Sequence, residues 1–234
     1  MEKNKKIFIT IFVIVIIAII GCVLYFTVFI APEGGLTPFS NEFMEGEFVG
    51  TVNVINESNK WAVPYKDPVH HIEYNMSTSK NSSFLVDLYK YQGMKGPEIR
   101  KYNGQEWNIY SAQGMTGNAS SNSSNSSNIV NVFMCVADKD NQSYVIYVVF
   151  NGNSDVNASG SVYSEGFTKY IEPLLKSITL KHNNDAPKLN EILGIDETSF
   201  NQQATLLNQA INGNKTAIAA LSGGSFEYYS FSCR

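Results

Sequence analysis

The sequence predicts an α+β protein in three parts: a single N-terminal transmembrane helix, an antiparallel β-meander sheet packed with helices, and a C-terminal helical extension. Three observations lead to this prediction. Residues 7–30 form one uncharged apolar run. Several segments between residues 47 and 150 have the apolar patterns of strands and are separated by turn-forming residues. After residue 164, apolar side chains recur at helical spacing instead.

The N-terminal segment has the length and flanking charge of a membrane anchor. The run IFITIFVIVIIAIIGCVLYFTVFI covers residues 7–30, and a helix of that length extends over about 36 Å, more than the roughly 30 Å hydrocarbon core of a bilayer. Residues 1–6 contain Lys3, Lys5 and Lys6, so the positive-inside rule places them in the cytoplasm. The predicted partner of residues 7–30 is therefore the lipid bilayer, and the rest of the chain is predicted to be extracytoplasmic.

Two other interpretations of this segment also export the rest of the chain. The tetrapeptide IIGC at residues 19–22 resembles a lipobox, in which Cys22 would be lipidated after cleavage. The apolar run continues beyond Cys22, however, where a lipidated cysteine would be followed by a polar tether. A cleaved signal peptide has a shorter apolar core and a small-residue cleavage site. The sequence shows neither feature.

Charge and composition exclude one class of partner. The whole chain has a net charge of −4, and removing Glu2 and the three N-terminal lysines leaves 14 basic and 20 acidic residues for the exported part. Binding to phosphates needs clustered Lys and Arg, so a nucleic-acid partner is not expected. Apolar residues make up 44% of the chain, which is enough to build a folded core.

Asparagine and serine supply much of the polarity of the exported part. The segment GNASSNSSNSSN at residues 117–128 cannot bury enough surface to offset its chain entropy, so it predicts a solvated loop. Outside the membrane, Asn-x-Ser/Thr is an acceptor for N-linked glycan. The predicted acceptors are Asn56, Asn75, Asn81, Asn118, Asn122, Asn125, Asn141, Asn157 and Asn214.

A tether at residues 31–46 leads into an α+β domain predicted over residues 47–180. Residues 47–55 are strand-like. The next extended pieces, WAVPY and PVHHIEY, each contain a proline and are therefore expected at edge positions. Residues 83–91 (SFLVDLYKY) alternate between two faces and predict another strand.

A hairpin and two apolar strands complete the predicted sheet. Asn103-Gly104 separates two alternating runs, and this dipeptide favours a type I′ turn, which needs positive φ at both central residues. Residues 129–137 and 143–150 are apolar on both faces apart from Asn131, so they are expected to be the innermost strands.

The rest of the chain is predicted to be mainly helical. Apolar residues between residues 164 and 178 form a stripe that would pack on the sheet. Pro173 is expected to kink or restart this helix. A short returning strand follows, and the extension at residues 181–234 again shows helical apolar spacing.

Three segments carry a resemblance to a known family: GQEWNIY (104–110), SYVIYVVF (143–150) and FTKYIEPLLKSITL (167–180). A membrane-anchored β-meander with a helix and a short strand after its penultimate strand resembles the PsbP-like fold, as in archaeal membrane-anchored exported proteins of unassigned role. The resemblance covers residues 47–180. It implies an antiparallel sheet flanked by helices and a binding or assembly role.

Few residues point to catalysis or metal binding. The histidines are His70, His71 and His182. A metal site of His70 or His71 with Glu73 is conceivable, but adjacent histidines in a strand face opposite sides and would not chelate together. Neither a G-x-S-x-G motif nor an EF-hand loop occurs. No catalytic, cofactor-binding or metal-binding residue is assigned.

Two cysteines lie in the exported part, Cys135 in an apolar strand and Cys233 near the C-terminus. Outside the cell these thiols can pair, and the disulfide would lock the tail onto the sheet. The alternative is a buried free Cys135 and an exposed Cys233.

The sequence thus favours a non-enzymatic binding, scaffold or assembly module at the cell surface, with a cell-surface protein or a glycan as its ligand. Two alternatives remain open. One is a cell-envelope hydrolase that uses His70 or His71. The other is an accessory subunit of a membrane complex that docks through the C-terminal helices.

Overall fold

The computed structural model describes residues 35–56, 59–116, 128–151, 154 and 156–223. Within these residues, no helix is both long enough and apolar enough to cross a bilayer. Several sequence predictions concern residues outside these ranges: the anchor at residues 7–30, the glycan acceptors Asn118, Asn122 and Asn125, and Cys233.

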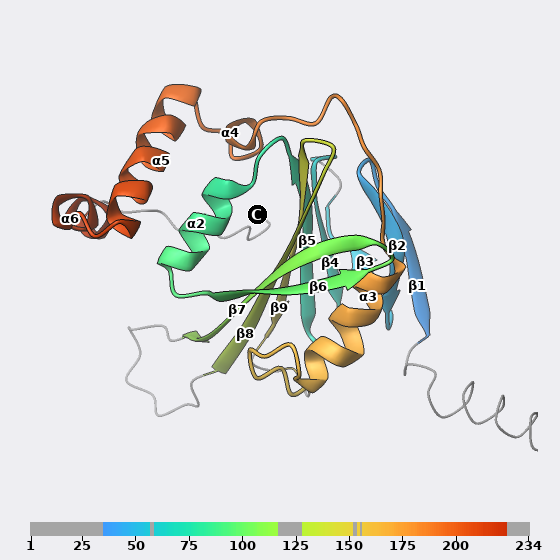
Figure 1. Cartoon of the computed structure of the whole chain (residues 1–234). Helices are drawn as coiled ribbons and strands as arrows, with labels where there is room; N and C mark the ends of the chain where they lie inside the picture. Colours follow the sequence, from blue (N-terminus) through green and yellow to red (C-terminus); the bar gives the residue numbers. More distant parts are fainter. Residues whose placement is uncertain (1–34, 57–58, 117–127, 152–153, 155, 224–234) are drawn as a thin grey trace, which may run out of the picture. The chain divides into compact units, whose positions relative to one another are not determined.

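The described chain is α+β, as predicted, with two antiparallel sheets and several helices (Figure 1). The larger sheet has the strand order β3-β4-β5-β9-β8-β7-β6. Its strands are β3 (Asn53–Val54), β4 (Ala62–Asp67), β5 (Ile72–Ser79), β6 (Lys95–Tyr102), β7 (Gln105–Thr116), β8 (Asn128–Lys139) and β9 (Gln142–Phe150). The smaller sheet has the order β1-β2-β10 and consists of β1 (Leu36–Ser40), β2 (Met44–Val49) and β10 (Thr179–Leu180).

Turn residues determine the meander from β6 to β9. Asn103 and Gly104 have φ angles of 48° and 80°, so the predicted hairpin between β6 and β7 is confirmed. Asp140 and Asn141 have φ angles of 52° and 59° and make the corresponding turn between β8 and β9. Because β9 also pairs with β5, the two apolar strands β8 and β9 are interior, as predicted.

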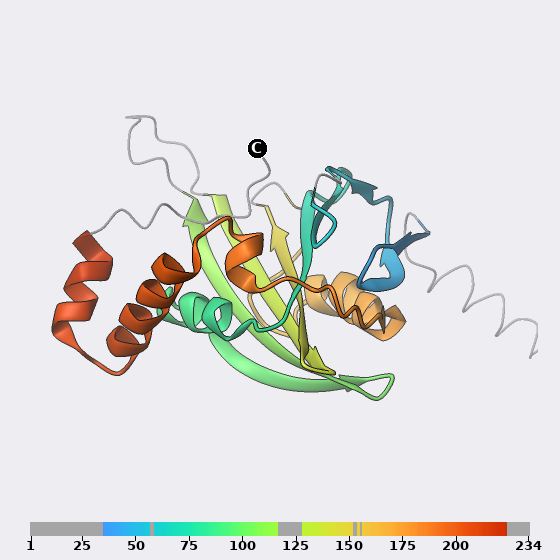
Figure 2. The same cartoon turned by 90° about the horizontal axis from the view of Figure 1, so that it is seen from above.

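One face of the larger sheet packs against the smaller sheet and against a helical segment made of η1 (Phe167–Ile171) and α3 (Glu172–Ser177) (Figure 2). Pro173 lies in the first turn of α3, directly after η1. The chain stays helical through this proline, and the predicted kink or restart is seen only as a change from the π-type hydrogen bonds of η1 to the α-type bonds of α3. The core on this face includes Phe48, Tyr74, Trp107, Phe133, Tyr144, Phe150, Phe167, Tyr170 and Leu174.

The opposite face of the larger sheet is covered by α2 (Ser83–Tyr91). The tyrosine rings of Tyr89 on α2 and Tyr147 on β9 stack with their centroids 5.1 Å apart. Helix α2 also packs against the C-terminal helices α4 (Leu189–Ile192), α5 (Glu197–Ile211) and α6 (Lys215–Gly223). The helical character predicted for residues 181–234 is thus confirmed where the structure describes them.

The strand predicted for residues 83–91 is wrong, because this segment is helix α2. Its buried residues Phe84, Leu85 and Leu88 lie on one face of a helix, whereas a strand would place Leu85 on the face opposite Phe84 and Leu88. The side chain of Asn81 accepts a hydrogen bond from the backbone N–H of Ser83 and so satisfies a donor at the start of the helix. The alternating apolar pattern of residues 83–91 therefore did not distinguish a strand from a helix.

Two further expectations need correction. The tether predicted at residues 31–46 contains strand β1, which pairs along its whole length with β2. The prolines also do not place their strands at edges: β5 lies between β4 and β9, and β4 lies between β3 and β5. The carbonyl of Pro64 accepts a hydrogen bond from the backbone N–H of Ile55. The ring nitrogen of Pro64, which has no N–H, faces the end of the two-residue strand β3, so Pro64 is tolerated there.

Candidate functional site: a groove between α2 and α5

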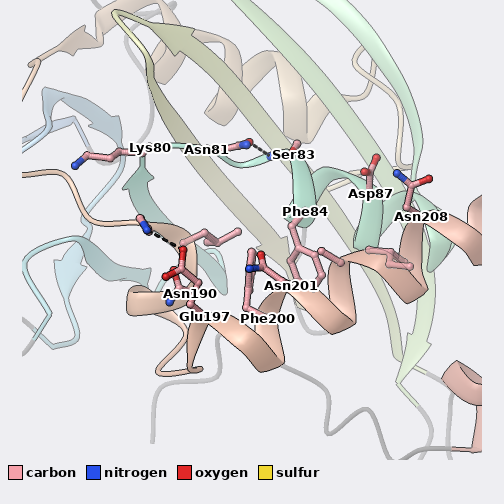
Figure 3. A pocket seen from close by; sticks show the side chains of 14 residues that line it. Lys80, Asn81, Ser83, Phe84, Asp87, Asn190, Glu197, Phe200, Asn201 and Asn208 are labelled. Carbon is pink, nitrogen blue, oxygen red and sulfur yellow. Dashed lines mark hydrogen bonds and ion pairs between the residues drawn. The ribbon is translucent and has the colours of Figure 1, made fainter.

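A groove of about 360 Å³ lies between helix α2 and the helices α4 and α5 (Figure 3). Its wall on the α2 side begins at the end of β5 and continues along the first turns of the helix, and its other wall follows one face of α5. The residues that line it are Lys80, Asn81, Ser83, Phe84, Asp87, Lys188, Leu189, Asn190, Glu197, Phe200, Asn201, Ala204, Leu207 and Asn208.

The floor of the groove is apolar and holds the two helices together. Phe84 of α2 points toward Phe200 of α5, and their ring centroids are 4.8 Å apart (Figure 3). Leu189 and Leu207 are buried in the same cluster. This packing fixes the distance between the walls, so the groove is a preformed feature of the fold.

Four asparagines line the rim of the groove, and each has at least one amide atom without a hydrogen bond to the described residues: Asn81, Asn190, Asn201 and Asn208. Asn81 uses its Oδ1 to accept from Ser83 N at 2.8 Å, and Asn208 uses its Oδ1 to accept from Asn212 Nδ2 at 2.7 Å. Asn190 donates its Nδ2 to Ile195 O at 3.1 Å. Within the described residues, the Nδ2 groups of Asn81 and Asn208, the Oδ1 of Asn190 and the whole amide of Asn201 make no hydrogen bond.

Charged side chains sit at the ends of the groove. Lys188 Nζ lies 2.9 Å from Glu197 Oε1, and this carboxylate raises the pKa of the lysine. Asp87 lies on α2 and Asn208 on α5 at the other end (Figure 3). The groove thus offers hydrogen-bond donors and acceptors, the Lys188–Glu197 ion pair and the charged side chains of Lys80 and Asp87 around an aromatic floor, an arrangement suited to binding a polar ligand.

A second hollow of about 500 Å³ lies beside the groove and shares Lys80 with it. It is lined by residues of the β8–β9 turn and of the segment after β10: Asp140, Asn141, Gln142, His182, Asn183, Asn184 and Ala186. Gln142 is buried and donates to Thr78 Oγ1 while accepting from Asn183 N, so its amide is occupied in joining strands to this segment.

His70 and His71 do not lie in a strand, as the metal argument assumed, but in the turn between β4 and β5. His70 is buried, and its Nδ1 lies 2.7 Å from Asp67 Oδ2. Its ring also contacts the ring of Tyr170, with centroids 5.0 Å apart. His71 is exposed with a φ of 55°. Within the described residues, the His70 ring makes no hydrogen bond to a serine, threonine or cysteine.

The surroundings of Asp67 are unusually rich in buried polar groups. Tyr74 is fully buried, and burial together with the charge of Asp67 and the neighbouring Tyr170 raises the pKa of its phenol. Tyr74 and Tyr170 belong to the core between the larger sheet and η1, and neither they nor Asp67 line the groove. The cluster therefore belongs to the packing of the turn against η1.

The glycan acceptors predicted from the sequence differ in their surroundings. The side chains of Asn56, Asn81, Asn141, Asn157 and Asn214 are exposed, whereas Asn75 is half-buried in the interior strand β5. Asn81 lines the groove and Asn141 lines the second hollow. Their modification remains a prediction.

Cys135 lies in β8 and is fully buried in the core between the larger sheet, the smaller sheet and η1. Burial raises the pKa of its thiol, so the thiolate is disfavoured. Because Cys233 lies outside the described residues, the predicted disulfide remains a prediction. Comparison of peptide masses with and without reduction tests it.

Neither the groove nor the Asp67–His70 pair was predicted from the sequence. The pair had a local signal: Asp-Pro followed by His three residues after the aspartate favours a turn in which the carboxylate accepts from backbone N–H groups. The groove had no such signal, because its walls come from segments more than 100 residues apart in the chain.

Comparisons with known proteins add little to these observations. No family model matches the chain, and a search of curated proteins found no match. A crystal structure of a protein from Bacteroides thetaiotaomicron VPI-5482 is similar at 10% sequence identity, with a TM-score of 0.38 over 71% of this chain. The match spans 57% of that protein. The resemblance to the PsbP-like fold stays a prediction.

Proposed function

We propose that this chain is a single-pass membrane protein whose extracytoplasmic α+β domain binds carbohydrate in the groove between α2 and α5. The uncharged segment at residues 7–30 and the lysines before it support an anchor in the lipid bilayer with a cytoplasmic N-terminus. The ligand is a glycan at the cell surface, and the role is binding without catalysis.

The observation that carries this proposal is the set of four asparagines around a phenylalanine floor. An amide group both donates and accepts, as does each hydroxyl of a sugar, so a ring of partly free amides matches a neutral oligosaccharide. An aromatic and aliphatic floor suits the apolar C–H faces of sugar rings. The groove volume of about 360 Å³ lies within the range of ordinary ligand pockets.

The groove residues support binding over hydrolysis. Among the described residues that line the groove there is no histidine or cysteine, and the hydroxyl group comes from Ser83. Of the two carboxylates, Glu197 is paired with Lys188. The hydrolase alternative would instead need His70 or His71; His70 is buried between Asp67 and Tyr170, His71 is exposed in the same turn, and neither lines the groove.

Paired variants of α5 test the binding site. We expect Asn201→Ala/Asn208→Ala in the full chain to weaken binding of a soluble tetrasaccharide at least tenfold. The control Gln202→Ala/Gln209→Ala changes two exposed residues with the same spacing on the same helix that do not line the groove. Titration calorimetry with mannotetraose, cellotetraose and chitotetraose provides the measurement. No binding of any of the three, or equal effects of the two variants, would reject the proposal.

The location requires its own measurement. Protease treatment of intact cells should remove the domain while residues 1–6 stay protected. A reporter fused after Arg234 that is active only in the cytosol would reject the proposed topology.

A further inference from the structure

We infer that Asn81 carries an N-linked glycan and that this glycan lies in the α2–α5 groove of its own chain, where it competes with soluble carbohydrate. The inference rests on the proposed function, because it needs both export and a groove that binds sugars. It names a modification site and a built-in occupant for that groove.

The geometry at Asn81 leaves the reactive atom available. Oδ1 accepts the hydrogen bond from Ser83 N at 2.8 Å, whereas Nδ2 makes no hydrogen bond within the described residues. The side chain is exposed, and Ser83, the third residue of the acceptor motif, is also exposed. Modification at Nδ2 therefore leaves the hydrogen bond at the start of α2 in place.

The covalent step uses a lipid-linked oligosaccharide pyrophosphate as its second substrate, supplied by the membrane in which the chain is inserted. The bond between the anomeric carbon and the pyrophosphate oxygen breaks, and a bond between that carbon and Nδ2 forms. One amide proton leaves with the released lipid pyrophosphate. No oxidation or reduction takes place.

The position of Asn81 explains why its glycan would occupy the groove. Figure 3 shows Asn81 beside Ser83 at the start of α2, and both residues line the groove together with Asn190 and Glu197 of the opposite wall. A sugar chain attached there meets Oδ1 of Asn190 and the amide of Asn201, which also line the groove. A short flexible linkage gives an effective concentration in the millimolar range, so even a weak site is filled by a tethered ligand.

Another acceptor has the same local geometry in a different place. Asn214 precedes α6, and its Oδ1 accepts from Thr216 N at 3.0 Å and Ala217 N at 3.2 Å. Asn214 is exposed, but it does not line the groove. A glycan at Asn214 is therefore the matched control for a glycan at Asn81.

The test compares full chains, purified in detergent from a host that exports and glycosylates them. Ser83→Ala removes the acceptor motif at Asn81, and Thr216→Ala removes the motif at Asn214; both keep the backbone N–H groups that the asparagines bind. Glycopeptide mass spectrometry of the unaltered chain is expected to find a glycan on Asn81. An unmodified Asn81 overturns the inference.

Two readouts then examine the groove. We expect Ser83→Ala to bind the tetrasaccharide probes at least tenfold more tightly than the glycosylated chain, because the competitor is gone. Backbone amides of residues 197–208 should exchange hydrogen several times faster in Ser83→Ala, since no glycan covers them. Thr216→Ala should change neither quantity.

The outcomes separate this inference from the proposed function. If a glycan on Asn81 is present but Ser83→Ala changes neither affinity nor exchange, the inference is wrong, while a loss of binding in Asn201→Ala/Asn208→Ala would still support the groove. If exchange changes but no probe binds any form, the glycan lies in the groove and the proposed binding of external carbohydrate is wrong.

Discussion

Asp67 Oδ2 lies 2.7 Å from His70 Nδ1 across the turn between β4 and β5, and both side chains are buried. The second carboxylate oxygen accepts from the backbone N–H groups of Val69 at 2.8 Å and His70 at 3.0 Å. One carboxylate thus holds the backbone of the turn and the histidine ring, which in turn packs on Tyr170 of η1.

Removing this carboxylate should destabilise the domain far more than removing an exposed one nearby. We expect Asp67→Ala to lower the free energy of unfolding by about 3–5 kcal/mol, because the histidine and two backbone donors lose their buried partner. The comparison is Glu73→Ala, which breaks the exposed ion pair with Lys66 (3.0 Å) and should cost at most about 1 kcal/mol. Urea denaturation measures both; equal losses would contradict the role given to Asp67.

Gly50 should be intolerant of a side chain because it lies against the same carboxylate. Its φ is 94°, and a Cβ there would lie 2.8 Å from Asp67 Oδ2. We expect Gly50→Ala to cost about 2 kcal/mol or more, from strain and from displacement of Asp67. Gly213 has a φ of 83° but open space around it, so Gly213→Ala reports the backbone strain alone, at about 1 kcal/mol. Similar melting temperatures for the two variants would show that the contact with Asp67 is unimportant.

Local patterns predicted the parts of the fold that depend on neighbours in the sequence. Asn103-Gly104 specified its hairpin, and the apolar runs specified β8 and β9, because turn geometry and two-sided burial leave a mark on a few consecutive residues. Residues 83–91 failed because their apolar positions satisfy both periods. Long-range packing distinguishes the helix: Phe84 packs on Phe200, from a segment more than 100 residues away, and Tyr89 stacks on Tyr147 of the sheet.

The candidate site was less predictable than the fold for the same reason. Asn81 was noticed as a glycan acceptor, but nothing local indicated that it lies at a groove with Asn190 and Asn201. The sequence predicted a strand around His70, whereas the chain turns there and brings the histidine ring onto Asp67. Sites built from distant segments appear only after the long-range packing is known.

The stability of the domain should fall at alkaline pH, in part through Tyr144. This side chain is fully buried, and its OH donates to Lys181 O at 3.0 Å. Burial, followed by the charge of Asp140, raises the pKa of Tyr144 from its ordinary value of 10.0 to about 12.

Because the folded-state pKa of Tyr144 is the higher one, its contribution to stability is complete below pH 10 and is lost as the pH rises from about 10 to about 12. Other buried tyrosines add to the decline. The slope of unfolding free energy against pH reports how many protons are released on unfolding. We expect Tyr144→Phe to lower that number by up to one in this pH window. Denaturation series from pH 8.5 to 12 measure the slope; an unchanged slope would show that Tyr144 does not ionise on unfolding there.

Helices α4, α5 and α6 should be able to loosen without unfolding the sheet, because they are held to α2 through the cluster around Phe84 and Phe200. The cluster that joins them to α2 is separate from the core between the sheet and η1. We expect Phe200→Ala to cost about 3 kcal/mol and to speed hydrogen exchange in residues 189–221, while β8 and β9 keep their protection. Ile211 is 46% exposed on the same helix, so Ile211→Ala should change exchange little. If exchange in β8 and β9 accelerates as much as in α5, the C-terminal helices and the sheet unfold as one unit, and the groove cannot open independently of the core.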